Sequence, residues 1–556
     1  MAAAPSAVPP VVQGQDKDVE RSATTATTSE TSSIEPSDDL EKLGKQRPAC
    51  FKSGLQEIGF LVSIFGSNLL AWHGWLSSVL LTPKKQQQEF LISGFNVLLP
   101  TLQNQERFSS TAPSAGAWTW PSNVFSLVAG AFLLPVGRLA DLYGGRVVYM
   151  GGLVWLFFWA LVGGFSANYV MLVVVRAVQG LGASAFLPAG INLMGNMYRP
   201  GPRKNTVFSL YCGCAPFGFF IGILLAGVSA RFLYWGWFFW IASIAMAVLS
   251  VISYFCVPED EAPPERVNLT MDWWGCATSV SALILIVYAV TESSKSGWQS
   301  PGIIVPFILG LLLLGVFVYV EARIAKDPIL PLSIFSTKDI APLFVALFLA
   351  YGSFGIYLFY ASFYIEKVLH IDPLLTALWF APLAGGGLAI ALLGGFTLHL
   401  LPGTALLALS CAGFIVCNLL LALAPDNPNY WAWIFPAMLS ATVGIDIMYN
   451  VSSIFITTNV AKTQQGLAGG CINGLLFVGM SFFLGWADLA TASRAEFGLR
   501  ESFKTSLFLG VGLGGVAALI VLVFIRIGKA RSDLTLEERE AQEQRGTEEN
   551  KQPLPS

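Results

Sequence analysis

Two ionisable side chains lie deep inside apolar runs of this chain. Asp446 is flanked by two isoleucines, and Arg176 is flanked by valine and alanine. A charge at the centre of a bilayer costs about 2.5 to 3.5 kcal/mol on insertion scales, so each group needs an interior partner or a water-filled cavity. Removal from water favours the protonated form of a carboxyl group, so Asp446 could load and release a proton near neutral pH. We take Asp446 as a candidate for proton coupling and expect a functional role for Arg176; the alternative is that both only hold helices together.

Amide side chains accompany both groups at helical spacing. Asn450 lies four residues after Asp446 and therefore on the same helix face, where it could hydrogen-bond the acid or a cargo molecule. Gln179 lies three residues after Arg176. Together with Asn192, farther along the same run, these amides are candidates for a substrate pocket.

A short charged turn separates two apolar runs between Gly137 and Arg146. Gly144 and Gly145 are expected to supply the positive φ that a tight hairpin turn needs. Asp141 suits a carboxylate that reaches the N-terminus of a neighbouring helix, and Gly137, one turn earlier on the same face, lets helices approach. We interpret this turn as a cytoplasmic latch; the alternative is a simple hairpin turn.

A further run carries small residues and a proline, at Gly213, Pro216, Gly218 and Gly222. Small residues four apart let helices pack closely, and a proline removes one backbone donor and bends its helix. The alternative interpretation is ordinary small-residue packing.

The elements that must position these residues are membrane-spanning helices. Hydrophobic residues make up 54% of the 556 residues and charged residues 12%, with a mean hydropathy of +0.62, unlike soluble domains. About fourteen apolar runs can each cross roughly 30 Å of hydrocarbon, which takes about 20 helical residues. The sequence therefore predicts an all-α membrane protein. Loops on the side of the two tails hold about twice as many Lys and Arg residues as the opposite loops, which predicts cytoplasmic termini.

Composition also argues against several classes of function. A net charge of −3 gives no basic footprint for nucleic acid. With three histidines and no pattern typical of an intramembrane enzyme, we expect neither a metal site nor catalysis. The eight cysteines lie mostly within apolar runs and imply no disulfide framework.

The first span is interrupted at residues 71–93. Joining 58–70 directly to 94–102 would give one crossing of about 33 Å, so we expect 71–93 to be an insertion or a gene-model artefact. The predicted organisation comprises a disordered cytoplasmic tail (1–50), a six-helix bundle (51–257), a cytoplasmic loop with two linker helices and a connecting loop (258–338), a second six-helix bundle (339–528) and a second cytoplasmic tail (529–556).

The charged turn resembles the loop between spans 2 and 3 of the major facilitator superfamily, roughly Gly-x-Leu-x-Asp-Arg-x-Gly-Arg-Arg/Lys. Leu142 and Gly145 stand where the family usually has arginine. The matching positions, which the resemblance makes a cytoplasmic gate motif, are Gly137, Leu139, Asp141, Gly144 and Arg146.

Three other segments are similar to patterns of the same family. Arg176-x-x-Gln-Gly resembles a span 4 pattern, which implies a role for Arg176 near proton transfer. Asn96-Val-x-Leu-Pro resembles the end of span 1, and this adds Asn96 to the pocket candidates. The run from Gly213 to Gly222 resembles an antiporter signature and suggests export.

The resemblance is strongest to fungal-type fourteen-span drug:proton antiporters, whose relatives are associated with aminotriazole resistance, boron efflux or low-affinity ammonium transport. It implies the major facilitator fold, with two six-helix bundles that rock around a midplane site and two linker helices. The implied function is proton-coupled efflux of a small organic compound, toxin or secondary metabolite, powered by the proton gradient without a cofactor. Uptake of a small solute such as ammonium and a non-transporting sensor are the alternatives.

The expected partners follow from this function. They are a small-molecule substrate, protons and the lipid bilayer, without nucleic acid, and the chain is expected to be a monomer. We expect it in the plasma membrane, with a vacuolar or other internal membrane as the alternative.

Overall fold

The computed structural model consists mainly of membrane-length helices. The residues that it describes are 47–48, 50–70, 95–103, 105–111, 118–198, 203, 207, 214–259, 270–330, 334–335, 339–397, 401–458 and 465–528. Within this part of the chain there is no β-strand, and the predicted all-α class is confirmed.

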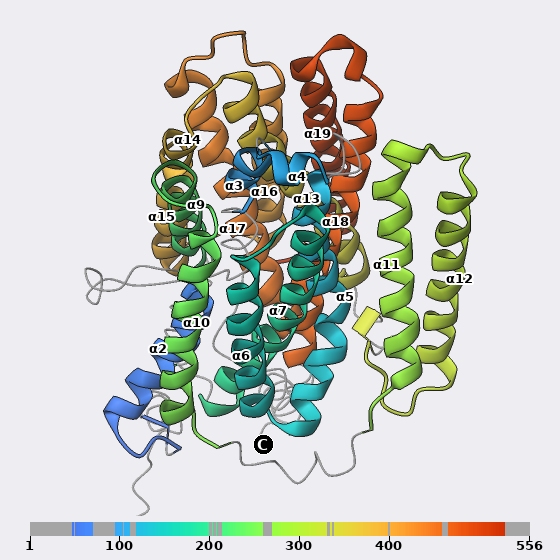
Figure 1. Cartoon of the computed structure of the whole chain (residues 1–556). Helices are drawn as coiled ribbons and strands as arrows, with labels where there is room; N and C mark the ends of the chain where they lie inside the picture. The colour runs from blue at the N-terminus through green and yellow to red at the C-terminus, as the bar shows by residue number, and fades with distance from the viewer. Residues whose placement is uncertain are drawn as a thin grey trace, which may run out of the picture.

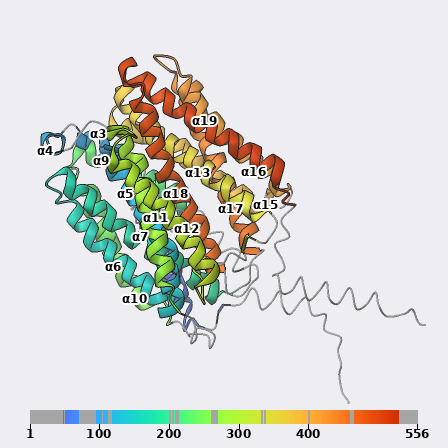
Figure 2. The same cartoon turned by 90° about the vertical axis from the view of Figure 1, so that its right-hand side faces the viewer.

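The helices fall into a first half, a linker pair and a second half (Figures 1 and 2). The first half contains α2 (Gly54–Leu70), α3 (Phe95–Gln103), α4 (Glu106–Ser109), α5 (Trp120–Tyr143), α6 (Gly145–Gly163), α7 (Tyr169–Met197), α9 (Cys214–Phe232) and α10 (Trp237–Cys256). The linker pair is α11 (Trp273–Ser296) and α12 (Pro301–Arg323). The second half contains α13 (Ile340–Phe363), a π-helical turn (Tyr364–Val368), α14 (Pro373–Trp379), α15 (Ala381–Thr397), α16 (Gly403–Ala422), a second π-helical turn (Tyr430–Ile434), α17 (Phe435–Thr458), α18 (Gln465–Ala492), a 3-10 turn (Ala495–Phe497) and α19 (Leu499–Phe524).

Eleven helices in the described part are long and apolar enough to cross a membrane. They coincide with eleven of the predicted runs. The remaining three runs hold α2 with α3, then α9, then α14 with α15. The first two of these runs extend beyond the described residues, and the third is divided into helices of 7 and 17 residues, so the total of fourteen spans stays a prediction.

The predicted insertion at 71–93 lies outside the described residues. The helices on either side of it, α2 and α3, both pack against α9. Two pieces of a single membrane crossing would be expected to share such a neighbour.

The turn between α5 and α6 consists of one residue. Gly144 has φ 96° and ψ 140°, a conformation that L side chains rarely adopt, so this position requires glycine. Gly145 already belongs to α6 and has no positive φ, so the expectation that both glycines supply this freedom was wrong for Gly145. We call the end of the molecule that carries this turn the motif end, and the other end the opposite end.

The two halves meet where α18 packs against α5 and α7, where α3 packs against α13 and α14, and where α9 packs against α14 and α15. At Gly130 on α5 a Cβ would lie 2.8 Å from Val478 Cγ2 and 2.9 Å from Phe477 Cβ, so the absence of a side chain permits this close approach.

The linker pair lies beside the two bundles, against the line where α5 meets α18 (Figure 1). Helix α11 packs against both α5 and α18, and α12 packs against α11. A Cβ at Gly310 of α12 would lie 2.7 Å from Ile286 Cγ1 of α11, which shows how closely the linker helices pack. Side-chain caps fix the first turn of α11, where Asp272 accepts a hydrogen bond of 2.9 Å from the Gly275 backbone N–H.

Candidate functional site

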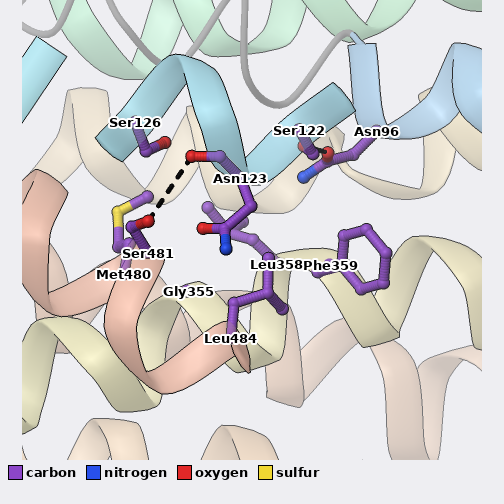
Figure 3. A pocket seen from close by; sticks show the side chains of 10 residues that line it. All are labelled: Asn96, Ser122, Asn123, Ser126, Gly355, Leu358, Phe359, Met480, Ser481 and Leu484. Atoms are coloured by element: carbon purple, nitrogen blue, oxygen red, sulfur yellow. Dashed lines mark hydrogen bonds between the residues drawn. The ribbon is translucent and has the colours of Figure 1, made fainter. Parts of the chain in front are cut away.

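A pocket lies between the two halves (Figure 3). It contains about 290 Å³ of space that no atom fills, counted together with the open solvent at its mouth. None of its lining side chains is charged. The lining residues are Asn96 of α3, Ser122, Asn123 and Ser126 of α5, Gly355, Leu358 and Phe359 of α13, and Met480, Ser481 and Leu484 of α18.

Helix α5 gives the pocket its polar wall. Ser122 and Ser126 are four residues apart and therefore lie on one face, next to Asn123. The Ser122 hydroxyl donates to Asn96 Oδ1 of α3, and the Ser481 hydroxyl of α18 donates to the Asn123 carbonyl oxygen at 3.4 Å. Hydroxyl and amide groups from both halves thus converge on one small space.

Asn123 is the most informative of these residues. Its side chain is 1% exposed, and its Nδ2 donates a hydrogen bond of 3.0 Å to the hydroxyl of Thr291 on α11. Its Oδ1 is buried and has no hydrogen-bond partner. An unsatisfied buried acceptor costs about 1 to 3 kcal/mol, so this atom is prepared to accept a hydrogen bond from a bound molecule.

Arg176 lies behind the pocket wall and does not line the pocket. Its side chain is fully buried, with the guanidinium carbon 4.4 Å from the ring centre of Phe95 and 4.5 Å from that of Phe125. Its Nε donates to the Pro121 carbonyl oxygen at 3.1 Å, in the first turn of α5. Stacking between two rings suits the planar guanidinium group. Arg176 thereby joins α7 to the helices that carry Asn96 and Ser122.

Gln179 extends this arrangement within the first half. Its Oε1 accepts a hydrogen bond of 3.2 Å from Arg176, and its Nε2 donates to the Trp159 carbonyl oxygen at 3.1 Å. These contacts place Gln179 between α6 and α7, and it does not line the pocket. Of the four amides predicted for the pocket, Asn96 is the one that the structure places there.

Asp446 and Asn450 lie together on α17, as their spacing predicts. Asn450 Nδ2 donates a hydrogen bond of 2.8 Å to the backbone carbonyl oxygen of Asp446. Both side chains are partly exposed, and neither lines the pocket. The structure therefore separates the predicted proton-coupling acid from the polar wall, and the coupling role of Asp446 remains a prediction.

The gate motif forms contacts at the motif end. Asp141 accepts a hydrogen bond of 2.6 Å from Asn192 of α7, and both residues line a second small hollow at the motif end, away from the pocket described above. Arg146 forms an ion pair of 3.1 Å with Glu259 and donates to the Tyr254 carbonyl oxygen at 3.1 Å. The motif thus joins the end of α5 to α7 and the start of α6 to the end of α10.

One motif position differs from its expected packing. A Cβ at Gly137 would lie 3.5 Å from Pro188 Cβ, an ordinary contact, so close packing does not require glycine there. Asp141 accepts from the side chain of Asn192, and its expected contact with a helix N-terminus stays a prediction. Leu139 lies on α5 between them.

The antiporter-like segment is only partly described. Gly213 and the side chain of Pro216 lie outside the described residues, and Gly218 and Gly222 are buried in α9. Gly227 of α9 approaches the second half closely, since a Cβ there would lie 2.9 Å from the Pro373 carbonyl oxygen.

Polar contacts join the two halves at the opposite end. Thr119 of the first half donates to Asp488 of α18, whose other oxygen accepts from Tyr360 of α13 at 3.2 Å. Lys367 Nζ donates to the Pro100 carbonyl oxygen at 3.3 Å. A third contact is the ion pair of Arg231 with Asp372, two partly exposed side chains, and it lowers the pKa of the Asp372 carboxyl. The pocket is therefore closed toward the opposite end.

Sequence reasoning missed most of the pocket wall. The polar positions of α5 stand in the apolar run Trp-Pro-Ser-Asn-Val-Phe-Ser, and their i, i+1, i+4 spacing could have indicated one polar face. Ser481 carries no such signal, because its run contains no second polar residue one turn away on the same face. Among the described residues there is no group of three or more His, Cys, Asp or Glu side chains that could hold a metal ion.

Comparisons with known proteins agree with the fold and the motifs. The model of the Major Facilitator Superfamily matches residues 88–484. The low affinity ammonium transporter of Saccharomyces cerevisiae is 31% identical over 420 residues, covering 74% of this chain and 81% of the relative. The aminotriazole resistance protein of the same yeast is 31% identical over 508 residues, covering 88% of each chain. The efflux pump terJ of Aspergillus terreus is 30% identical over 431 residues, covering 76% of this chain and 83% of the pump.

Solved structures share the fold at low identity. An auto-inhibited peptide transporter of the POT family has a TM-score of 0.59 at 15% identity, covering 86% of this chain and 99% of its own. The human organic anion transporter MFSD10 (TETRAN) has a TM-score of 0.54 at 14% identity, covering 84% of this chain and 98% of its own. The resemblance of the charged turn and the span 4 segment is thereby confirmed at the level of the family. The chain belongs to the Major Facilitator Superfamily and is a multi-pass membrane transporter.

Proposed function

We propose that this transporter exports small uncharged organic compounds from the cytosol in exchange for protons. The observation that carries this proposal is the pocket between the halves, whose wall offers hydroxyls, amides and apolar groups but no charge. An uncharged compound leaves no unpaired charge in such a site, whereas an ion would lose its hydration without compensation. The names of relatives that are efflux pumps or resistance proteins support the direction of export.

Asp446 is the residue that we assign to proton coupling. It is the acid at the middle of α17, and its partial exposure is consistent with access of water from one side. Arg176 has a second role in this proposal, because its contacts with Phe95 and Pro121 couple α7 to the pocket wall. The proton gradient supplies the energy, at about 2.3 kcal/mol per charge for each 100 mV of membrane potential.

We further propose that the motif end faces the cytosol, that the transporter is a monomer and that it resides in the plasma membrane. The excess of Lys and Arg on the loops of the motif end supports this orientation. Reaction of single introduced cysteines with impermeant reagents in intact cells tests the orientation. Labelling of an Arg323→Cys variant from outside would contradict it.

Purified protein in liposomes with an imposed pH gradient tests the transport reaction. An antiporter accumulates its compound in vesicles whose lumen is acidic, because protons leave as the compound enters. We expect accumulation of neutral compounds from a chemically varied panel, its loss on adding a protonophore, and none in protein-free vesicles. Accumulation only in vesicles with an alkaline lumen would indicate proton-coupled uptake and contradict export.

Replacement of Asp446 tests its assignment within the same assay. Asp446→Asn is expected to lower pH-driven flux at least about tenfold, because the amide cannot carry a proton. Asp426→Asn is the matched control, since Asp426 is an exposed loop carboxylate paired with Arg500. Unchanged pH-driven flux in a well-folded Asp446→Asn protein would remove this residue from the coupling role.

Ammonium uptake is the second candidate, because a relative at 31% identity is named a low affinity ammonium transporter. Methylammonium uptake by cells that lack their own ammonium transporters distinguishes it from export. Restored uptake would favour this candidate.

A further inference from the structure

The two halves line the pocket with different chemistry. All of the lining residues that come from α3 and α5 are polar, whereas those from α13 and α18 are apolar apart from Ser481. Figure 3 shows the amide and hydroxyl groups of α3 and α5 on one side of the pocket and Leu358, Phe359 and Leu484 on the other. A neutral compound with a polar edge and an apolar body can therefore pair its edge with the first half and bury its body against the second half.

Met480 is the flexible side chain of the apolar wall. The other apolar side chains of this wall are leucines and a phenylalanine, which carry branched or planar groups. Met480 is unbranched, with several rotatable bonds and a polarisable thioether, and its side chain is 5% exposed. A side chain of this kind can adapt to ligands of different shape by changing its rotamer.

The backbone around Met480 is held on two sides. A Cβ at Gly479 would lie 2.8 Å from a backbone carbonyl oxygen of α13, and a Cβ at Gly355 of α13 would lie 2.9 Å from Met480 Cβ and Cγ. On the other side, a Cβ at Gly130 of α5 would lie 3.1 Å from the Val478 backbone nitrogen. Because this turn of α18 packs directly on both neighbouring helices, the part of Met480 that can yield to a ligand is the far end of its side chain.

We propose that Met480 is a specificity-determining residue that sets the largest apolar body the pocket accepts. The far end of its side chain can move without a shift of either helix, so it yields to compounds up to a certain size and excludes larger ones. The polar wall of the first half recognises the edge of the same compound. This inference rests on the proposed function, in which the pocket binds the exported compound, and it narrows the substrate class to neutral amphiphiles of limited length.

The test measures binding to the purified full-length transporter in lipid nanodiscs by calorimetry, with the heat from protein-free nanodiscs subtracted. The probes are benzamides with a para-alkyl chain that grows one carbon at a time. Each probe keeps the same primary amide, which can both donate and accept hydrogen bonds at the polar wall. In the wild type, affinity should rise about fourfold for each added methylene until the chain reaches the limit set by Met480, and should then fall.

Shortening the side chain should move this limit. Met480→Ala removes Cγ, Sδ and Cε, so the chain length of tightest binding should increase by about two to three carbons, and the affinity for the longest probes relative to benzamide should rise at least about tenfold. Met480→Val also shortens the side chain and should shift the preference in the same direction, which keeps the test open if the alanine variant does not fold. Met480→Leu nearly conserves the volume and should leave the preferred length unchanged.

Met246→Ala is the matched control. Met246 is a buried methionine of α10, 1% exposed, that does not line the pocket. Its replacement removes the same atoms and lowers stability, but it should leave the preferred chain length unchanged.

The outcomes separate the two proposals. If the wild type binds no probe, the neutral pocket of the proposed function is wrong and this inference falls with it. If the wild type binds the probes but the folded Met480→Ala or Met480→Val protein keeps its preferred chain length, the role of Met480 is overturned and the proposed function stands. A longer preferred chain in these variants, with Met480→Leu and Met246→Ala unchanged, supports the inference.

Discussion

The close packing of Gly227 against α14 predicts how one added methyl group would change the conformation of the transporter. A Cβ at Gly227 would lie 2.9 Å from the Pro373 carbonyl oxygen and 3.0 Å from Leu374 Cα and from Ala377 Cβ. Two of these three atoms belong to the backbone, so a change of rotamer cannot remove the clash. In Gly227→Ala, α9 and α14 must therefore move apart.

The free-energy cost of the added methyl group falls on one conformation of the transporter, the one that is closed at the opposite end. Overpacking of this kind costs about 1 to 3 kcal/mol. Because α9 and α14 belong to different halves, the strain is relieved when the halves separate at the opposite end, and the fold of each half is unaffected. A difference of about 1 to 3 kcal/mol between two states shifts their equilibrium about 5- to 150-fold. Gly227→Ala should therefore favour the state that is open at the opposite end.

Reaction of Ser122→Cys with an impermeant maleimide measures this shift, since Ser122 lies in the pocket behind the closed end. In a background with the native cysteines replaced by alanine, Gly227→Ala is expected to raise labelling from the opposite end at least about fivefold. Gly512→Ala on α19, where nothing lies within 4 Å of the added Cβ, is the control and should leave the rate unchanged. Equal labelling rates in Gly227→Ala and the control, with both proteins folded, would refute the reasoning.

Three further predictions concern the turn, the linker and the buried arginine. Gly144→Ala should lower the free energy of unfolding by about 1 to 3 kcal/mol, because φ is 96° at this position. Gly151→Ala is the control, because its added Cβ would have nothing within 4 Å. Equal melting temperatures for the two variants would contradict this prediction. Hydrogen bonds from Thr270 hold the pKa of Asp327 below its usual range, so this carboxylate stabilises the fold above about pH 4, and its contribution is lost as the pH falls through the lower folded-state pKa. The wild type should therefore melt at a higher temperature than Asp327→Asn at about pH 6, and the difference should shrink as the pH is lowered below about 4; a difference independent of pH would argue against this. Arg176→Lys should reduce transport at least about tenfold, because an ammonium group cannot replace the planar guanidinium group between the rings of Phe95 and Phe125. Arg323→Lys is the control and should transport normally. Full activity of Arg176→Lys would show that the planar contacts are dispensable.

The helices could be predicted from the sequence because membrane crossings leave long apolar runs. The run around Asp446 and the turn at Gly144 were both located correctly in this way. The shortest helices were harder, because α14 and α15 divide one predicted run and α3 is separated from α2 by residues outside the described part. Apolar length indicates that a crossing exists, but it does not reveal breaks within the crossing.

The pocket could not be predicted to the same extent, because distant segments form it. Asn123 and Ser481 are 358 residues apart, and Thr119 and Asp488 are 369 residues apart, yet each pair is hydrogen-bonded. The position of a polar residue along one run gives its depth but not the face that meets another helix. This explains why Asn192, a predicted pocket residue, instead contacts Asp141 at the motif end.

Because the linker pair lies on one side of the two bundles, the two flanks of the transporter differ in how far additional helices separate them from lipid. Helix α11 covers the line between α5 and α18, and α12, the most exposed of the candidate spans, lies outside it. An oily compound dissolved in the bilayer therefore meets a wall of two additional helices on that flank. Within the described part of the chain the linker pair leaves the other flank uncovered, where α9 faces α14 and α15, so lateral entry toward the pocket is left to that flank.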